Sequence, residues 1–248
     1  MIGILDSGVG GLSIYREINK RFPNAGIIYF ADKLHFPYGE KTDEQLLPII
    51  RAATQTLVES GAEVVVFGCN SATVATISSL RVEFKIPIIG IEPAVKQAAR
   101  ITKNGKIGVL ATQRTTEDHD GESLAPDCTL CKAHHAALVS KIENDFENID
   151  DGTLRDAIEL FIKADVDTIV LGCTHYHFLK ERLEEMYPNL VFVDPTEAVV
   201  SHLAEVVREN NIEIVGGNDI FLCSADCKGF SNSLETLLGI KNAAIREV

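Results

Sequence analysis

The stretch "VVVFGCN" (64–70) is an apolar run that passes through Gly-Cys into a polar residue. A similar stretch, "TIVLGCT" (168–174), follows in the second half of the chain. Short apolar runs that end in Gly or polar residues are typical of strands buried on both faces of a parallel sheet. The two stretches therefore predict two buried strands, each leading directly into a cysteine.

Other apolar runs repeat in the same order. "IGILDS" (2–7) and "IPIIGIEP" (86–93) are matched by "IGVLAT" (107–112) and "LVFVDP" (190–195). Segments with helical periodicity or capping signals lie between the runs, at 42–61, 153–165 and 196–210. Strands that alternate with helices predict parallel sheets covered on both faces. We therefore expect an α/β fold built from two similar halves.

The composition narrows the class of partner. The chain has 248 residues, a net charge of −13 and 46% hydrophobic residues, which is ordinary for a globular protein. An acidic surface argues against nucleic acid, because phosphate contacts need a basic face. No signal peptide and no apolar run of membrane-spanning length is visible, so we expect no membrane contact and a cytoplasmic location with reduced cysteines.

Polar residues and two cysteines stand where the strands are expected to end. In parallel sheets, ligands bind beyond the carboxyl ends of the strands. These positions are Asp6, Ser7, Cys69, Asn70, Cys173 and Thr174. A thiolate is stabilised by a helix N-terminus, and two acid/base groups on opposite faces of one carbon could invert its configuration. A cysteine that ends a buried strand is, on the other hand, often only a small apolar residue.

The remaining cysteines form two short motifs. Cys128 and Cys131 form C-x-x-C ahead of His134 and His135, and a looser C-x-x-x-C lies at 223–227. Structural zinc sites usually combine two well-spaced ligand pairs. We interpret these residues as core or surface thiols and expect no metal.

Two loops invite a binding interpretation. "ADKLHFPYGEK" (31–41) is either an ordinary β-to-α connection or a loop that holds a ligand. "DSGVGGLS" (6–13) resembles a dinucleotide fingerprint, with Asp32 after the next strand, but Ser13 replaces the third Gly or Ala. The same turn could instead offer backbone amides to a carboxylate. A nicotinamide oxidoreductase is therefore the weaker alternative.

Six motifs together resemble the cofactor-independent aspartate/glutamate racemase family. They are "DSGVGGLS", "FPYGEK", "GCNSAT", "GIEPAVK", "IGVLAT" and "LGCTHY". The resemblance implies an isomerase that interconverts L- and D-glutamate without a cofactor and supplies D-glutamate for peptidoglycan. It implies two α/β domains related by a pseudo-twofold axis, residues 1–95 with 205–248 and residues 96–204, with the active site in the cleft between them. A homodimer is also implied.

The resemblance further assigns roles to individual residues. Cys69 and Cys173 match the two catalytic bases, and Asp6, Glu143 and His175 match the groups that support them. The positions that match substrate contacts are Asp6, Ser7, Tyr38, Gly39, Asn70, Ser71, Thr174 and His175. Each also has a simpler interpretation: Asp6 could only cap a helix, His175 could be a core residue, and Glu143 could be a surface charge.

The second half departs more from the family pattern than the first. Ser71 replaces a Thr but keeps the hydroxyl, whereas His177 and Ser140 stand where Pro is common, and a Ser-x-x-Tyr pattern is replaced by Asp118 and Gly121. Two alternatives follow: a racemase for another acidic amino acid such as aspartate, or a paralogue that binds glutamate without turnover. Retention of both Cys69 and Cys173 argues against the second.

Overall fold

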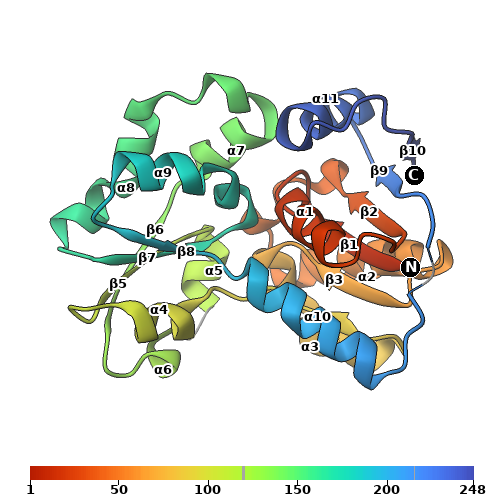
Figure 1. Cartoon of the computed structure of the whole chain (residues 1–248), viewed down its shortest axis with the longest axis horizontal. Helices are drawn as coiled ribbons and strands as arrows, with labels where there is room; N and C mark the ends of the chain where they lie inside the picture. The colour runs from red at the N-terminus through yellow and green to blue at the C-terminus, as the bar shows by residue number, and fades with distance from the viewer. Residues whose placement is uncertain (119–120, 215) are drawn as a thin grey trace. The chain divides into compact units, whose positions relative to one another are not determined.

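The chain forms two compact units, which are coloured by residue number in Figure 1. The structure is a computed structural model that describes residues 1–118, 121–214 and 216–248. Unit 1 comprises Met1–Ile91 together with Thr196–Val248, and unit 2 comprises Glu92–Pro195. Within the described residues, no helix is long and apolar enough to cross a bilayer.

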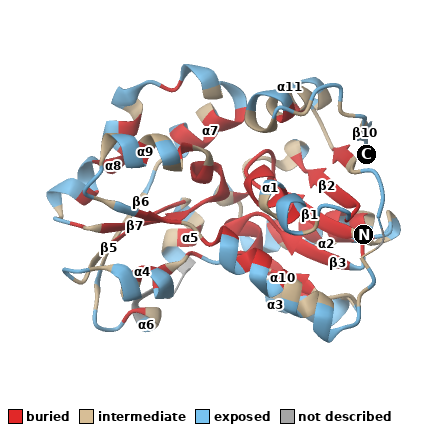
Figure 2. Ribbon diagram, in the orientation of Figure 1, coloured by how far each residue is buried: buried red, intermediate tan, exposed pale blue. Residues whose placement is uncertain are grey.

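Unit 1 is built on a six-stranded sheet in which every pairing is parallel, in the order β10-β9-β2-β1-β3-β4. The strands are β1 (Ile2–Asp6), β2 (Ile27–Ala31), β3 (Val64–Phe67), β4 (Ile88–Ile89), β9 (Ile220–Cys223) and β10 (Ile245–Glu247). The central strands are buried along their whole length, as Figure 2 shows, which agrees with their continuous apolar sequence.

The helices of unit 1 connect these parallel strands. They are α1 (Leu12–Arg21), α2 (Asp43–Glu59), α3 (Asn70–Glu83), α10 (Thr196–Glu209) and α11 (Cys227–Leu238), with 3-10 turns η1 (Lys33–His35) and η2 (Tyr38–Glu40). Helix α2 begins at the predicted Thr cap: the Thr42 hydroxyl accepts from the Gln45 amide, and the Gln45 side chain accepts from the Thr42 amide. Pro48 lies early in this helix, as expected.

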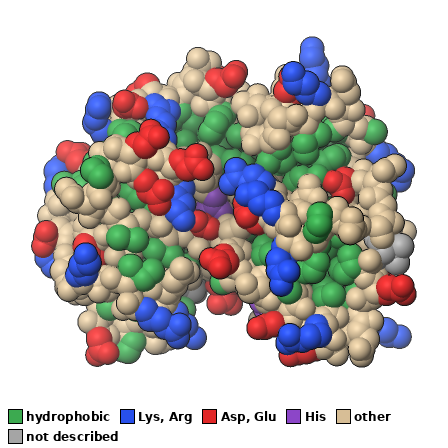
Figure 3. All heavy atoms as spheres, in the orientation of Figure 1, with side chains coloured by type: hydrophobic (Ala, Val, Ile, Leu, Met, Phe, Trp, Pro, Cys, Tyr) green, Lys and Arg blue, Asp and Glu red, His purple; other side chains and the backbone are tan. Residues whose placement is uncertain are grey.

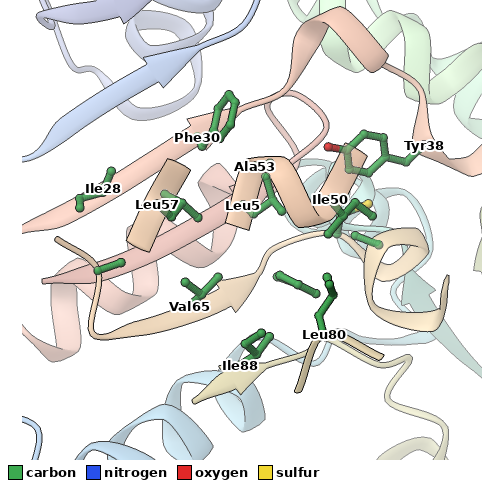
Figure 4. Packing of buried hydrophobic residues seen from close by; sticks show 14 of the residues in the cluster. Leu5, Ile28, Phe30, Tyr38, Ile50, Ala53, Leu57, Val65, Leu80 and Ile88 are labelled. Atoms are coloured by element: carbon green, nitrogen blue, oxygen red, sulfur yellow. The ribbon is translucent and has the colours of Figure 1, made fainter. Parts of the chain in front are cut away.

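The main core of unit 1 joins neighbouring strands to helix α2. Figure 4 shows Leu5, Ile28, Val65 and Ile88 from four strands of the sheet, close to apolar residues of α2. The helix contributes Ile50, Ala53 and Leu57 to this cluster. Tyr38 packs at its edge, so the loop after β2 is anchored in the core.

Unit 2 has a four-stranded sheet in the order β6-β5-β7-β8, again entirely parallel. The strands are β5 (Lys106–Ala111), β6 (Thr129–His134), β7 (Thr168–Gly172) and β8 (Val191–Val193). The helices are α4 (Val95–Ile101), α5 (Gln113–Asp118), α6 (Gly121–Leu124), α7 (Ala136–Asn144), α8 (Asp151–Lys163) and α9 (Lys180–Met186), with 3-10 turns η3 (Phe146–Asn148) and η4 (Thr174–Leu179).

The strand order and register confirm that the two halves share one α/β fold. The order β2-β1-β3-β4 in unit 1 has its counterpart in β6-β5-β7-β8 of unit 2. Ile2 pairs with Ile27 and Val64, and Ile107 pairs with Leu130 and Thr168. Cys69 and Cys173 therefore follow equivalent strands, β3 and β7.

Several predicted boundaries differ from those in the structure. The predicted strand 64–70 ends at Phe67, because Cys69 already serves as the N-cap of α3. The predicted strand 86–93 keeps only Ile88–Ile89 in regular pairing. Helix α8 begins at Asp151 instead of residue 153, because the Asp150 side chain accepts from the Thr153 amide and caps it.

The return of the chain to the first unit also occurs earlier than the predicted boundary at 204 and 205. Helix α10 begins at Thr196, directly after unit 2, and contacts α1 and β4 of unit 1. Its buried side chains include Val199, Val200 and Leu203. A boundary at residue 205 would divide this helix and assign its buried residues to unit 2, although they pack in unit 1.

Candidate active site

The two cysteines lie at the part of each sheet where parallel α/β folds bind ligands. In unit 1 the chain reverses its strand order between β1 and β3, and in unit 2 between β5 and β7. Ligands bind beyond the carboxyl ends of the strands at such a point. Asp6 ends β1 and Ser7 follows it, whereas Cys69 follows β3 and Cys173 follows β7.

Cys69 sits at the N-cap of α3, with its backbone fixed by two hydrogen bonds. The Thr73 amide and the Thr73 hydroxyl both donate to the Cys69 carbonyl, each at 3.0 Å. The same hydroxyl accepts from the Ile91 amide at 3.0 Å. The cysteine is 9% exposed, so its thiol is largely shielded from water. Thr73 thus ties the cysteine to the segment that follows β4.

Asp6 is fully buried at the end of β1, and its carboxylate shapes the glycine-rich turn. The Gly8 amide donates to Asp6 Oδ1 at 2.7 Å. A Cβ at Gly11 would lie 2.9 Å from Asp6 Cβ and 3.0 Å from the Tyr29 hydroxyl, so only glycine fits there. The Gly8 amide of the predicted anion-binding turn is therefore already used by the carboxylate of the chain itself.

The "PYG" loop is held by a network around Asp32. The Tyr38 hydroxyl donates to Asp32 Oδ2 at 2.6 Å, the Ser224 hydroxyl donates to Oδ1 at 2.8 Å, and His35 Nδ1 lies 2.9 Å from both oxygens. Tyr38 and Asp32 are 1% and 2% exposed. This network of hydrogen bonds holds the aromatic, charged loop in place.

The pKa of Tyr38 is set by its burial and by charged groups near it. Burial raises its pKa well above 10, with Asp32, Cys69 and Asp6 adding to the effect. The phenol therefore stays protonated and donates to Asp32. Tyr38 and Cys69 pack in the same buried cluster of unit 1.

The other residues assigned to substrate contacts in unit 1 differ in exposure. Ser7, Asn70 and Ser71 are buried, whereas Gly39 is half-buried in η2. Asn70 Nδ2 donates to the Ile91 carbonyl at 3.3 Å, and its Oδ1 is buried without a hydrogen-bond partner among the described residues. An unsatisfied buried acceptor is costly, so it points to a donor that arrives with a ligand.

In unit 2, Cys173 begins a chain of three side chains. Cys173 Sγ lies 3.8 Å from His175 Nδ1, and His175 Nε2 lies 2.8 Å from Glu143 Oε2. All three residues are at most 4% exposed. Glu143 comes from α7, which packs on the 3-10 turn η4 that carries His175.

The pKa of His175 reflects its burial and its interactions with both Cys173 and Glu143. Burial alone would lower the pKa of His175, but its interactions with Cys173 and Glu143 outweigh burial and raise the pKa well above 6.5. His175 is therefore suited to carry a proton beside a thiolate. The interpretation of Glu143 as a surface charge is wrong, because Glu143 is buried and bonded to His175. The catalytic role of His175 stays a prediction.

The sequence model of the family described as "Asp/Glu/Hydantoin racemase" matches residues 2–203. This chain belongs to that family. A glutamate racemase of Stutzerimonas stutzeri (strain A1501) is 38% identical, covering 98% of this chain and 96% of the relative.

Solved structures of the racemase family agree with this fold. Glutamate racemase isoform RacE1 from Bacillus anthracis matches with a TM-score of 0.88 and 27% identity, covering 100% of this chain and 97% of its own. Escherichia coli glutamate racemase, solved with L-glutamate and the activator UDP-MurNAc-ala, matches with a TM-score of 0.87 and 30% identity, covering 96% and 93%.

The structure describes the surroundings of two residues that depart from the family pattern, His177 and Ser140. His177 is buried, its Nε2 donates to the Leu171 carbonyl at 3.2 Å, and burial lowers its pKa to about 4. It is therefore neutral at pH 7 and supports the turn after β7. Ser140 lies on the exposed side of α7. The side chain of Asp118 and the surroundings of Gly121 lie outside what the structure describes.

Within the part of the chain that the structure describes, no hydrogen bond joins the remaining cysteines to Cys69, Cys173 or Asp32. Cys131 lies within strand β6, and Cys128 packs against the core of unit 2 just before it. Burial raises the pKa of Cys223 to about 12, and its thiol donates to the Ala225 carbonyl at 2.8 Å. All six cysteines are free of disulfides, and the described part of the chain contains no group of three potential metal ligands.

Sequence reasoning missed two residues of the unit 1 cluster. The sequence pointed to Asp32 only as the acidic residue of a dinucleotide fingerprint, whereas its carboxylate receives hydrogen bonds from Tyr38 and Ser224. Its position directly after strand β2 was the available signal. Ser224 comes from the far end of the chain and carried no signal, because only the pairing of β9 with β2 brings it there.

Proposed function

We propose that this chain is a glutamate racemase that interconverts L- and D-glutamate by two-base proton transfer at Cα, without a cofactor. The names of its relatives support the substrate. The observation that carries the mechanism is the equivalent placement of Cys69 and Cys173 after β3 and β7 of the two repeated sheets. Each cysteine also lies in a cluster of buried polar groups.

The proposed reaction needs one base and one acid on opposite faces of the substrate carbon. One cysteine, as thiolate, takes the Cα proton, and the electron pair of the broken C–H bond delocalises into the substrate carboxylate. The other cysteine, as thiol, then gives its proton to the opposite face of the carbanion. Hydrogen bonds to the substrate carboxylate stabilise the developing charge. The roles reverse for the other enantiomer.

Family resemblance assigns Cys69 to D-glutamate and Cys173 to L-glutamate. The neighbouring side chains support separate roles for the two cysteines, because each cysteine lies beside different acid/base groups. His175 and Glu143 can accept and hold a proton beside Cys173. Tyr38 packs in one buried cluster with Cys69, and Asp6 ends strand β1, which pairs with the strand that leads to Cys69.

Substrate contacts are proposed for the polar residues of both strand ends. Buried Asn70 Oδ1 suits the ammonium group of an amino acid, which brings three donors. The other proposed contacts are Asp6, Ser7, Tyr38, Gly39, Ser71, Thr174 and His175. Acidic and basic side chains are mixed over the face shown in Figure 3, so an anionic substrate must be recognised by local groups. A cytoplasmic homodimer that supplies D-glutamate for peptidoglycan is the corresponding cellular role.

The test is turnover by the purified chain after dialysis against a chelator, with no cofactor added. L-glutamate should lose its optical rotation, and L-aspartate should react far more slowly. Cys69→Ser and Cys173→Ser should each lower kcat by about a hundredfold or more, because a serine hydroxyl is a much weaker acid than a thiol. Cys128→Ser is the matched control and should leave kcat unchanged. Full activity in either of the first two variants would contradict the role of that cysteine.

A further inference from the structure

The turn that follows strand β9 is bonded to the "PYG" loop at several points. The Ser224 hydroxyl donates to Asp32 Oδ1 at 2.8 Å and accepts from the Leu34 amide at 3.0 Å. The Ser224 amide donates to the Ala31 carbonyl at 3.1 Å. One residue thus makes three hydrogen bonds to a segment that lies about 190 positions earlier in the sequence.

The same turn contributes a charge contact nearby. Asp226 caps α11 and lies 3.4 Å from the ammonium of Lys33, whose side chain is 7% exposed. Strand β9 pairs with β2 so that Cys223 is the partner of Ala31, which places residues 224–226 directly beside the start of the loop. Figure 1 shows β9 and α11 with β2 in unit 1. The C-terminal segment therefore holds the loop from the side of the sheet.

Asp32 transmits this contact to Tyr38. Its carboxylate bonds Ser224 through Oδ1 and Tyr38 through Oδ2, at 2.8 and 2.6 Å. A carboxylate that receives charge-assisted hydrogen bonds on both oxygens has little freedom to rotate. The Ser224 hydroxyl, together with His35 Nδ1 at 2.9 Å from both oxygens, thus fixes the orientation of the Asp32 carboxylate and with it the position of the Tyr38 hydroxyl.

We propose that Ser224 is a positioning residue for substrate binding, which acts through Asp32 and the Leu34 amide to fix the Tyr38–Gly39 segment. This inference rests on the proposed racemase function. Among the described residues, the hydrogen bonds of Ser224 go to Asp32, Leu34 and Ala31, so we expect its effect on the geometry of the loop. Loss of its hydroxyl should mainly weaken substrate binding and leave proton transfer between the bound substrate and the thiols little changed.

The test compares Ser224→Ala with Ser224→Thr and Ser233→Ala in the full chain. Thr keeps the hydroxyl, and Ser233 is a half-buried serine of the same C-terminal segment that donates only to the Gly229 carbonyl. Ser224→Ala should raise KM for both enantiomers about tenfold, since hydrogen bonds to charged groups are the stronger kind, and change kcat by less than about threefold. In Ser224→Thr, KM should return close to the wild-type value, and Ser233→Ala should have the same KM as the wild type.

Amide hydrogen exchange over residues 33–41 provides a readout that does not need turnover. Exchange there should be about tenfold faster in Ser224→Ala than in the wild type or Ser233→Ala. If the wild type does not turn over glutamate, the proposed function fails and the exchange rates alone decide whether Ser224 positions the loop. An unchanged exchange rate, or an unchanged KM in an active Ser224→Ala enzyme, would overturn the inference. An equal KM increase in Ser224→Ala and Ser224→Thr would also overturn it.

Discussion

At the residue scale, the two cysteines share a position in the fold but differ in their surroundings. Cys173 has a histidine and a buried carboxylate in line with it. Cys69 instead packs in a cluster with Tyr38 and follows a strand that pairs with β1, which ends at the buried Asp6. The same position in the fold therefore places two thiols among different polar neighbours.

Glu143→Gln tests the support of Cys173. The amide cannot stabilise a charged His175, so kcat/KM should fall about tenfold or more. Because the two enantiomers have equal free energies, kcat/KM must fall by the same factor in both directions. The variant should affect proton removal from L-glutamate more than proton removal from D-glutamate. The kinetic isotope effect should therefore increase more for α-deuterated L-glutamate than for the α-deuterated D-enantiomer. Glu147→Gln, at an exposed glutamate of η3, is the control. An unchanged kcat/KM in Glu143→Gln would contradict the role of the pair.

His177 should make the stability depend on pH. Its folded pKa of about 4 lies below the ordinary 6.5, so its contribution is fully present above pH 6.5 and is lost as the pH falls toward 4. The free energy of unfolding of the wild type should therefore drop by about 3 kcal/mol more than that of His177→Gln between pH 7 and pH 4. Chemical denaturation at several pH values measures this. The exposed His202 supplies the control, because His202→Gln should follow the wild type; identical curves for His177→Gln and wild type would exclude the effect.

At the element scale, the strand-to-helix junctions position the chemistry. Thr73 bridges the Cys69 carbonyl and the Ile91 amide, so it joins the start of α3 to the segment after β4. Gly90 packs against this threonine, since a Cβ there would lie 2.4 Å from Thr73 Cγ2. The cysteine backbone is thus fixed from two sides.

Thr73→Val removes the bridging hydroxyl while keeping the shape of the side chain. The Ile91 amide then loses its acceptor, so the free energy of unfolding should fall by about 1–3 kcal/mol, and kcat should fall as well. Thr73→Ser should restore both. Thr76→Val is the matched control, because the buried Thr76 hydroxyl donates only to the Ala72 carbonyl within the same helix. Equal losses in Thr73→Val and Thr76→Val would show that the bridge has no special role.

The sequence predicts these elements well where one pattern dominates. Continuous apolar runs revealed β1, β3, β5 and β7, and the Thr42 cap revealed the start of α2. Strand β6 was hidden because "TLCKAH" mixes apolar, polar and charged residues, and its cysteine suggested a metal motif instead. The strand is half-exposed at the edge of its sheet, so no strong apolar pattern was needed there.

At the scale of the whole molecule, the chain contains one fold twice, with an addition to the first copy. The strand order and register repeat in both units, and only unit 1 is extended by β9 and β10 from the C-terminal segment. The repeated spacing of motifs could predict the duplication. It could not predict the contact of Ser224 with Asp32, because a pairing between β9 and β2 leaves no periodic signal in either segment.

The pseudo-twofold relation of the two units and a shared cleft stay predictions, and the two-base mechanism depends on them. Both thiols must reach the same Cα from opposite faces. In that case the proton removed from the substrate and the proton added to the product belong to different sulfur atoms. Each thiol holds only one proton, so the proton added to the product comes from solvent.

The most direct measurement is the racemisation of protiated L-glutamate in D₂O, stopped while little substrate has reacted. The two enantiomers are then separated, and the isotope at Cα is measured by mass spectrometry. We predict that the D-glutamate formed carries deuterium and that the remaining L-glutamate keeps its hydrogen. D-glutamate that retains the hydrogen of the substrate would show a single base acting on both faces and would contradict the two-cysteine account.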